Sequence, residues 1–359
     1  MPRPLPDPIL KDSPCTALAP MQDVTTWEFM KVVDQFGSPD YYFTEYFRVH
    51  ETSILEKHIL YSITNNPTDR PVFAQMIGEN LDYLARTVED LSKHPVAGID
   101  LNLGCPAPKV YKKKVGGGLL RDLDHVDKIF GLLREISPHR FTVKARIGFD
   151  DTLPFEGLIG LINKHNVDLL SLHGRTVKEM YWSDVHYDYI AHAVSKANCP
   201  VFANGNITSY LKGAEVLKDT GCFGLMVGRS AIRNPWIFRQ IREHFTGKEV
   251  YQPTLGDVYN YAHLLIDTLR KPKVPEQNYV NKLKKFFNFI GLSVDADGLF
   301  LHEIRRVRSY EAMNEVLKRH LLYKAETPYS TEPYPGLVAR PNRETLIRPL
   351  KETFSIKSN

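Results

Sequence analysis

The sequence has few cysteines and none of the spacings that cysteine-based sites need. Four cysteines occur in 359 residues, at positions 15, 105, 199 and 222. No two of them form a Cys-x-x-Cys pair, so the sequence predicts neither a metal site nor a disulfide framework. Three open short apolar runs and are interpreted as small buried side chains. Cys105 differs because it lies between Gly104 and Pro106, at the end of such a run.

Long apolar runs and a strong charge excess are also missing. No run could span a bilayer, and the proline-rich start, 1–8, has no apolar signal core, so we expect a cytoplasmic protein without a membrane partner. Lysine and arginine number 46 and aspartate and glutamate 42, a formal net charge of +4. This surplus is too small to establish a nucleic-acid partner by itself.

Short apolar runs alternate with amphipathic stretches between residues 14 and 245. The runs predict strands at 16–20, 42–46, 72–76, 98–103, 141–147, 169–173, 201–204 and 223–227. The stretches predict helices at 26–36, 80–93, 123–136, 155–164, 187–196, 211–218 and 235–245, the last capped by Asn234. This alternation predicts an α/β fold, a parallel (β/α)₈ TIM barrel. A doubly wound open sheet is disfavoured because no Gly-x-Gly-x-x-Gly follows the first strand.

The strand pattern stops after residue 245. Helical periodicity at 255–269, 275–290 and 309–319 predicts a C-terminal all-helical domain. We therefore expect a catalytic barrel domain over 1–245 and a helical domain over 251–324. The tail, 325–359, holds five prolines, and we expect it to be disordered or else to wrap the surface.

Polar residues follow the predicted strands where each one ends. In a barrel of this class the active site lies at those carboxyl ends. Buried amides and cations without partners cost several kcal/mol each, so their number predicts a polar ligand. Lys144 and Arg146 are two positions apart on one predicted strand, so both side chains point to the same face. The alternative is that they are two surface cations on an exposed edge strand. The strand ends carry, in order, Met21, Glu45, Gln75, Asn102 with Cys105, Lys144 with Arg146, His173, Asn204 with Asn206, and Gly228 with Arg229.

Two loop features extend this site. The turns after the seventh and eighth strands, 204–206 and 228–229, stand where this fold usually binds phosphate. Their glycines let backbone N–H groups approach an anion, and Arg229 can add a charge-assisted bond. The run Gly116-Gly117-Gly118 after Cys105 predicts a loop that can move over the site.

These motifs together resemble one enzyme family. The chain resembles the tRNA-dihydrouridine synthases, flavin enzymes that reduce selected uridines in tRNA. Within the family it is most similar to the bacterial type that acts on a D-loop uridine near position 16. The matching pieces are Ala19-Pro20-Met21, Thr44-Glu45, Leu-Asn-Leu-Gly-Cys-Pro at 101–106, Val143-Lys144-Ala145-Arg146, His173-Gly174-Arg175-Thr176, Asn204-Gly205-Asn206-Ile207, and Gly228-Arg229 with Asn234-Pro235-Trp236.

The resemblance implies FMN in the barrel mouth and NADPH as reductant. It implies hydride transfer from the flavin to C6 of uracil and proton donation from Cys105 to C5, with Asn102 facing both rings. Asn206 departs from the family, in which many members carry an acidic residue there. By position the cofactor contacts would be Ala19, Pro20 and Met21 on the ring, Gln75, Lys144 and His173 as hydrogen-bonding groups, and Asn204, Gly205, Asn206, Gly228 and Arg229 around the phosphate.

A tRNA partner requires contacts beyond the barrel mouth. Basic residues of the helical region are interpreted as a phosphate track, with a solvated helix face as the alternative. The aromatic pair Tyr181 and Trp182 either stacks on nucleotides or packs in the core. We expect a monomer. The expected substrate contacts are Arg146, Lys282, Lys284, Lys285, Arg305, Arg306 and Arg308.

Three other functions are compatible with parts of the pattern. A Schiff-base aldolase would use Lys144 as its nucleophile. Another FMN-dependent barrel, similar to a dihydroorotate dehydrogenase, would use Cys105 as a base. A tRNA-binding protein without catalysis is the third. The sequence does not identify the uridine that would be reduced.

Overall fold

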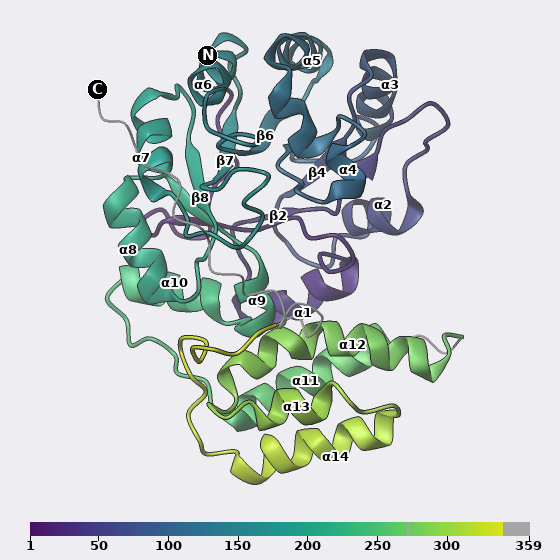
Figure 1. Cartoon of the computed structure of the whole chain (residues 1–359), viewed down its shortest axis with the longest axis vertical. Helices are drawn as coiled ribbons and strands as arrows, with labels where there is room; N and C mark the ends of the chain where they lie inside the picture. The colour runs from purple at the N-terminus through teal and green to yellow at the C-terminus, as the bar shows by residue number, and fades with distance from the viewer. Residues whose placement is uncertain (271–272, 340–359) are drawn as a thin grey trace.

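A closed parallel β-barrel forms the upper part of the molecule (Figure 1). The computed structural model describes residues 1–270 and 273–339. Strand β1 pairs with both β9 and β2, and β2 pairs with β4, which closes the sheet into a TIM barrel. The strands are β1 Cys15–Leu18, β2 Tyr41–Phe43, β3 Phe47–Arg48, β4 Val72–Ile77, β5 Gly98–Leu103, β6 Arg140–Arg146, β7 Leu169–His173, β8 Val201–Asn204 and β9 Gly224–Val227.

The second barrel strand is interrupted. Segment β2 pairs with the start of β4, through Tyr42 and Val72, whereas β3 pairs with the end of β4, through Phe47 and Met76. The sequence predicts one strand at 42–46, but residues 44–46 leave the ladder. Glu45 therefore lies in a gap between two short strand segments instead of at the end of a continuous strand.

Aromatic side chains fill the barrel interior. Phe43 and Phe73 stack with their ring centroids 4.9 Å apart, and Tyr41 and Phe202 stack at 6.1 Å. Leu5, from the N-terminal segment, packs against this cluster. Because the interior is packed, a ligand has room at the strand ends and not inside the barrel.

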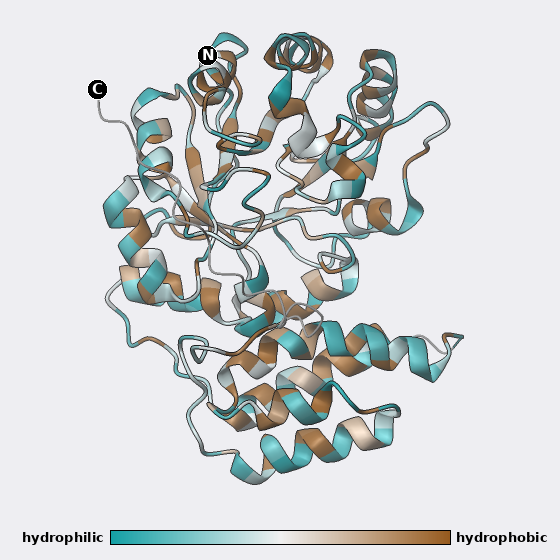
Figure 2. Cartoon of the chain, viewed as in Figure 1, coloured by the Kyte–Doolittle hydropathy of each residue, from teal (hydrophilic) through white to brown (hydrophobic). Residues whose placement is uncertain are grey.

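Amphipathic helices surround the sheet, and Figure 2 shows hydrophilic and hydrophobic residues alternating along them. Helix α5 buries Val126, Ile129, Phe130 and Leu133, one face at helical spacing, and the Asp122 side chain caps its start. The helices are α1 Trp27–Gly37, α2 Lys57–Thr64, α3 Leu81–Leu91, α4 Pro108–Tyr111, α5 Leu123–Ile136, α6 Phe155–Lys164, α7 Tyr187–Lys196, α8 Tyr210–Thr220, α9 Arg229–Arg233 and α10 Ile237–Phe245.

Two local predictions in the barrel need correction. Helix α10 begins at Ile237 with Trp236 as its N-cap, because Asn234 is the C-cap of the short helix α9. The three consecutive glycines do not form an open loop. They lie in the 3₁₀ helix η1 Gly116–Arg121 and are buried. A Cβ on Gly117 would lie 2.4 Å from Cγ2 of Val177, so this segment is tightly packed.

The helices that follow α10 form a group on one side of the barrel, in the lower part of Figure 1. Helix α12 packs against α9, and α11 packs against α1. The domain boundaries predicted above stay a prediction. The elements are α11 Leu255–Leu269, α12 Glu276–Ile290, η2 Gly291–Ser293, α13 Leu299–Ile304, α14 Tyr310–His320 and η3 Leu322–Lys324.

The first part of the tail, 325–339, is ordered and contacts the rest of the protein. Pro328 forms an antiparallel bridge with Thr254, and the Tyr329 side chain is buried. The Tyr329 hydroxyl lies 3.0 Å from the carbonyl oxygen of Arg233 and 2.7 Å from that of Ile290. The remaining tail, 340–359, lies outside the described residues.

Candidate active site

The polar residues predicted from the strand ends lie side by side at one end of the barrel. Asn102 of β5 pairs in register with Lys144 of β6, and Arg146 pairs with His173 of β7. His173 in turn pairs with Asn204 of β8. Because parallel neighbours in register occupy the same level, these side chains form one continuous arc around the barrel mouth.

The Asn102 side chain holds the Cys105 loop. Its Oδ1 accepts the backbone N–H of Gly104 at 3.0 Å and that of Cys105 at 2.9 Å. Its Nδ2 donates to Oε1 of Gln75 at 2.8 Å. Burial raises the pKa of the Cys105 thiol, against the opposing effect of the Ala107 backbone, Arg146 and Lys144. The thiol therefore keeps its proton near neutral pH.

Asp100, which was not predicted from the sequence, holds the Gln75 side chain that in turn contacts Asn102. Its Oδ2 accepts Nε2 of Gln75 at 2.7 Å and its Oδ1 accepts the Thr142 hydroxyl at 2.6 Å. Burial raises the pKa of the carboxyl group to about 6. Asp100 precedes Asn102 by two positions and so points to the same side of β5, a spacing that could have identified it.

Lys144 presents a half-buried cation to the mouth. Its Nζ donates to Oδ1 of Asn204 at 2.9 Å, and Nδ2 of Asn204 donates to the carbonyl of Met226 at 2.8 Å. Burial, with a further contribution from Arg146, lowers the pKa of Lys144 to about 8. No carboxylate of the described residues forms an ion pair with Lys144, so an electron-rich ligand would be stabilised there.

Arg146 fastens the loops around the thiol. Its Nε donates to the carbonyl of Gly104 at 3.0 Å, and its Nη1 donates to those of Thr176 and Met180 at 2.7 and 2.8 Å. Burial lowers its pKa to about 10. All three bonds reach backbone carbonyl groups. Arg146 therefore connects the loop that carries Cys105 to the loop after β7.

His173 is neutral in this environment. Burial, followed by the charges of Arg146 and Lys144, lowers the pKa of His173 well below its ordinary value. Nη1 of Arg175 lies 3.2 Å from Nε2 of His173, and a guanidinium can only donate. Nε2 is therefore the acceptor, and the ring carries its proton on Nδ1. Arg175 was quoted in the sequence motif, but its contact with His173 was not predicted.

The two turns predicted to bind phosphate follow β8 and β9. Gly205 and Asn206 both adopt positive φ angles, +116° and +46°. The Arg229 guanidinium lies 4.2 Å from the ring centre of Tyr181, and that ring also lies 5.4 Å from the guanidinium of Arg146. Tyr181 therefore packs between two cations in the site and not in the hydrophobic core.

An apolar wall completes the mouth opposite Lys144. The N–H of Ala19 donates to the carbonyl of Val227, which continues the β1–β9 pairing. A Cβ on Gly228 would lie 3.6 Å from Sδ of Met21 and 3.7 Å from Cβ of Ala19. The stretch from Ala19 to Met21 thus borders Gly228, where it can contact the face of a planar ring.

The basic residues of the helical region do not form one row. Lys282 and Lys285 of α12 border a cavity shared with the barrel, next to Glu45. Burial and Arg308 lower the pKa of Lys284. The Arg305 and Arg306 side chains instead donate to neighbouring groups, the Asn288 Oδ1 and the His302 carbonyl.

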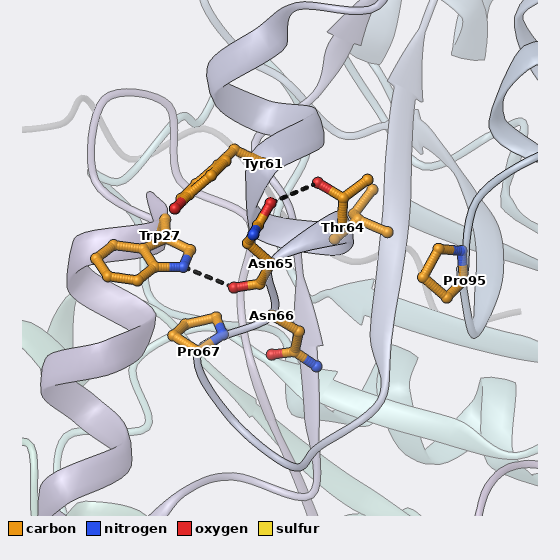
Figure 3. Close-up of a pocket in the computed structure, with 8 residues that line it drawn as sticks. Trp27, Tyr61, Thr64, Asn65, Asn66, Pro67 and Pro95 are labelled. Carbon is orange, nitrogen blue, oxygen red and sulfur yellow. Dashed lines mark hydrogen bonds between the residues drawn. The ribbon is translucent and has the colours of Figure 1, made fainter.

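A second cavity, of about 640 Å³, lies beside α1 and the end of α2 (Figure 3). The indole N–H of Trp27 donates to the carbonyl of Asn65 at 2.8 Å, and the Tyr61 ring packs against Trp27. Pro67 and Pro95 also line it. Its lining contains no carboxylate, lysine, arginine, histidine or cysteine.

Across 1–270 and 273–339, no group of three or more histidine, cysteine or acidic side chains is arranged to hold a metal ion. None of the helices in these ranges combines the length and apolar character that crossing a membrane requires.

Residues 17–307 match the Dihydrouridine synthase (Dus) family. The chain belongs to this family. A protein of Helicobacter pylori (strain ATCC 700392 / 26695), named probable tRNA-dihydrouridine synthase, is 38% identical over 232 residues, which are 64% of this chain and 70% of the relative. The tRNA-dihydrouridine synthase B of Pseudomonas putida is 36% identical over 192 residues, 52% of this chain and 56% of the relative.

A third relative covers more of the chain. The tRNA-dihydrouridine(16) synthase of Neisseria meningitidis is 25% identical over 308 residues, which are 84% of this chain and 92% of the relative. The family membership confirms the resemblance found in the sequence, and this member of the dihydrouridine synthases is a flavin-dependent oxidoreductase. The aldolase, the dihydroorotate-dehydrogenase-like enzyme and the non-catalytic binding protein are thereby set aside.

The site residues fit a flavin. A flavin ring needs an apolar surface on one face and polar partners at its edge, and its phosphate needs cations. Ala19 to Met21 offer the surface, and Lys144, without a carboxylate ion pair in the described ranges, offers the edge contact. The guanidinium groups of Arg175 and Arg229 lie on the side of the glycine turns.

Proposed function

We propose that the chain reduces the C5–C6 bond of one uridine in tRNA, with FMN as the flavin and NADPH as the reductant. The observation that carries the proposal is the hydrogen bond from the Cys105 backbone N–H to Asn102, which holds the loop that carries the thiol beside the strand position paired with Lys144. We further propose that the enzyme is cytoplasmic and acts as a monomer.

The cofactor residues are proposed by position. Gln75, Lys144 and His173 would hydrogen-bond the flavin, and Asn102 would face both the flavin and the uracil. The phosphate would be held by Asn204, Gly205, Asn206, Gly228 and Arg229, and the ring would lie on Ala19, Pro20 and Met21. When bound, FMN supplies the hydride that adds to C6 of the uracil.

The chain's own residues supply the proton and the charge stabilisation. Hydride addition places negative charge on the C5 and O4 side of the base, so a proton must reach C5. The Cys105 thiol donates it, and the thiolate regains a proton from solvent. The Lys144 cation stabilises negative charge at the mouth. Arg146 holds the Cys105 loop through the Gly104 carbonyl, and it is also proposed as a substrate contact.

The target uridine is proposed to lie in the D-loop near position 16. Support comes from the Neisseria relative, whose name states that position and whose similarity extends into the helical region. The base must leave the tRNA stack to reach the flavin, at a cost of a few kcal/mol. Contacts to the tRNA backbone would offset this cost. The proposed contacts are Lys282, Lys284, Lys285, Arg305, Arg306 and Arg308.

Replacing Cys105 tests the proposal. The variant Cys105→Ala should keep its flavin spectrum and its affinity for tRNA but lose at least about 100-fold in dihydrouridine formation, the usual contribution of a positioned acid. Mass analysis of the product tRNA measures the added two hydrogens. Cys199→Ala, which removes a buried thiol outside the site, is the matched control. Unchanged reduction by Cys105→Ala would refute the assignment of the acid.

A further inference from the structure

A cavity of about 460 Å³ lies between the barrel and helix α12, and none of the proposed chemistry uses it. Its walls come from two parts of the fold that are far apart in the sequence. Its charged and polar lining includes Asp23, Glu45 and His58 of the barrel and Asn281, Lys282 and Lys285 of α12.

The wall from α12 is positive. Asn278, Asn281, Lys282 and Lys285 recur at helical spacing, which places them on one face of α12 toward the barrel. In the described part of the chain, neither Lys282 nor Lys285 makes an ion pair or a side-chain hydrogen bond. Two lysines at one wall of a polar cavity therefore provide a place for an anion.

The opposite wall offers a hydrogen-bond acceptor. Glu45 lies in the gap between β2 and β3 and is only 3% exposed. Its Oε1 accepts the backbone N–H of Asp23 at 2.5 Å, and its Oε2 has no donor among the described residues. Burial raises the pKa of this carboxyl group. Oε2 is therefore able to accept a hydrogen bond from a ligand in the cavity.

The cavity is close to the reacting thiol. Tyr46 directly follows Glu45, and its pKa is raised first by burial and next by the nearby Cys105. A Cβ on Gly116 would lie 3.1 Å from Cβ of Cys105 and 3.0 Å from Cδ1 of Ile77, which belongs to the strand paired with β3. Tyr46, the chain neighbour of the cavity residue Glu45, therefore lies near the Cys105 thiol.

We propose that this cavity binds the nucleotide next to the target uridine, with its phosphate on Lys282 and Lys285 and its ribose 2′-hydroxyl donating to Glu45. A ribonucleotide presents these two groups side by side, an anion and a donor, which matches the two walls. The 2′-hydroxyl also distinguishes RNA from DNA. This inference rests on the proposed function, because it assigns a second nucleotide of the same substrate.

Chemically modified tRNA tests the inference one group at a time. Transcripts carry a single 2′-deoxyribose, or a single uncharged methylphosphonate, at each nucleotide flanking the target uridine. Affinity for the flavin-loaded enzyme is measured by fluorescence anisotropy, and dihydrouridine formation by mass analysis. We expect one flanking nucleotide at which each modification weakens binding about tenfold, as expected for loss of a charge-assisted hydrogen bond.

Variants of Glu45 and of the two lysines test which wall of the cavity contacts each modified group. In Glu45→Gln the oxygen stays with Asp23 and an amide nitrogen replaces the acceptor, so this variant should bind the 2′-deoxy and unmodified transcripts equally. The double variant Lys282→Gln/Lys285→Gln should bind the methylphosphonate transcript and the unmodified transcript with equal affinity. Lys218→Gln removes an exposed lysine of α8 that lies outside the cavity lining and outside the proposed tRNA contacts, and it should keep both discriminations.

The outcomes separate this inference from the proposed function. Wild-type binding that is insensitive to both modifications at every flanking position would overturn it, and so would variants that discriminate like the wild type. If the wild type formed no dihydrouridine at all, the proposed function would fail, whereas the binding measurements would still decide whether the cavity holds a nucleotide.

Discussion

At the scale of single residues, Asp100 controls how the catalytic loop is held. A Gln75 side chain can point its oxygen or its nitrogen toward Asn102. Because the Asp100 carboxylate accepts Nε2 of Gln75, the oxygen of Gln75 is left to accept Nδ2 of Asn102. Oδ1 of Asn102 is then free to accept the backbone of Cys105. One carboxylate thus determines the orientation of two amides and of the thiol loop.

Replacement of Asp100 should change how stability depends on pH. The pKa of Asp100 is raised by burial to about 6, so the folded protein holds this proton more tightly than the unfolded chain. Folding stability from this group is present below about pH 4 and is lost as the pH rises through 6. The free energy of unfolding of Asp100→Asn, relative to wild type, should therefore rise by about 2 kcal/mol from pH 4.5 to 7.5.

Urea unfolding at several pH values measures this difference. Asp90→Asn removes an exposed carboxylate that pairs with Lys93 and serves as the control, with no such trend expected. A constant difference between wild type and Asp100→Asn over this range would show that Asp100 does not carry the raised pKa.

The strand pattern predicted which residues lie at the barrel mouth, but it did not predict the residues that contact and orient them. Asn102, Lys144 and His173 each end a short apolar run, so their position in the barrel followed from the strand pattern. Asp100 lies inside such a run, and the contact of Arg175 with His173 depends on how a loop folds back. The two-residue spacing between Asp100 and Asn102 is a signal for Asp100, whereas the Arg175 contact has no periodic signal in the sequence.

At the scale of elements, the turn after β8 depends on Gly205. Its φ angle of +116° is strained for any other residue, and a Cβ would lie 2.9 Å from Cδ2 of His173. Gly205→Ala should lower the free energy of unfolding by about 1–3 kcal/mol. It should also weaken the binding of FMN to the apoprotein about tenfold, because the His173 ring must move.

A second glycine provides the control for that variant. Gly160 lies in α6, and a Cβ there would have no atom within 4 Å. Gly160→Ala should stabilise the protein by about 0.5–1 kcal/mol, since alanine favours the helix, and leave FMN binding unchanged. Urea unfolding and a flavin fluorescence titration measure both effects. Equal stability of the two variants would contradict the steric argument.

Periodicity in the sequence predicted the regular helices and strands, and it missed the elements that are short or interrupted. Strands 98–103, 169–173 and 201–204 and helices 123–136, 155–164, 187–196 and 255–269 agree with the structure at both ends. The second strand was predicted as continuous over 42–46 because aromatic residues flank Thr44 and Glu45, but β2 ends at Phe43. Helices α4, α9 and α13 have four to six residues, too few to establish a helical period.

At the scale of the whole molecule, α9 joins the barrel to the helical region. Helix α9 begins with Arg229 of the proposed phosphate site and ends with Arg233. The Arg233 guanidinium donates to Oγ of Ser293 at 2.7 Å and to the carbonyl of Thr331 at 3.0 Å. Tyr261 of α11 donates to the carbonyl of Ile232 at 2.9 Å. The position of α12, and with it the proposed nucleotide cavity, therefore depends on this junction.

Tyr329 is the most direct test of that junction, because its buried hydroxyl lies within hydrogen-bond distance of the carbonyls of Arg233 in α9 and Ile290 in α12. Tyr329→Phe leaves both carbonyls without this partner, so the free energy of unfolding should fall by about 1–3 kcal/mol. Tyr323→Phe removes the hydroxyl of a side chain that is 70% exposed and should have almost no effect. Denaturant unfolding of both variants measures the difference, and equal stabilities would mean that the 325–339 segment does not hold the barrel and the helical region together.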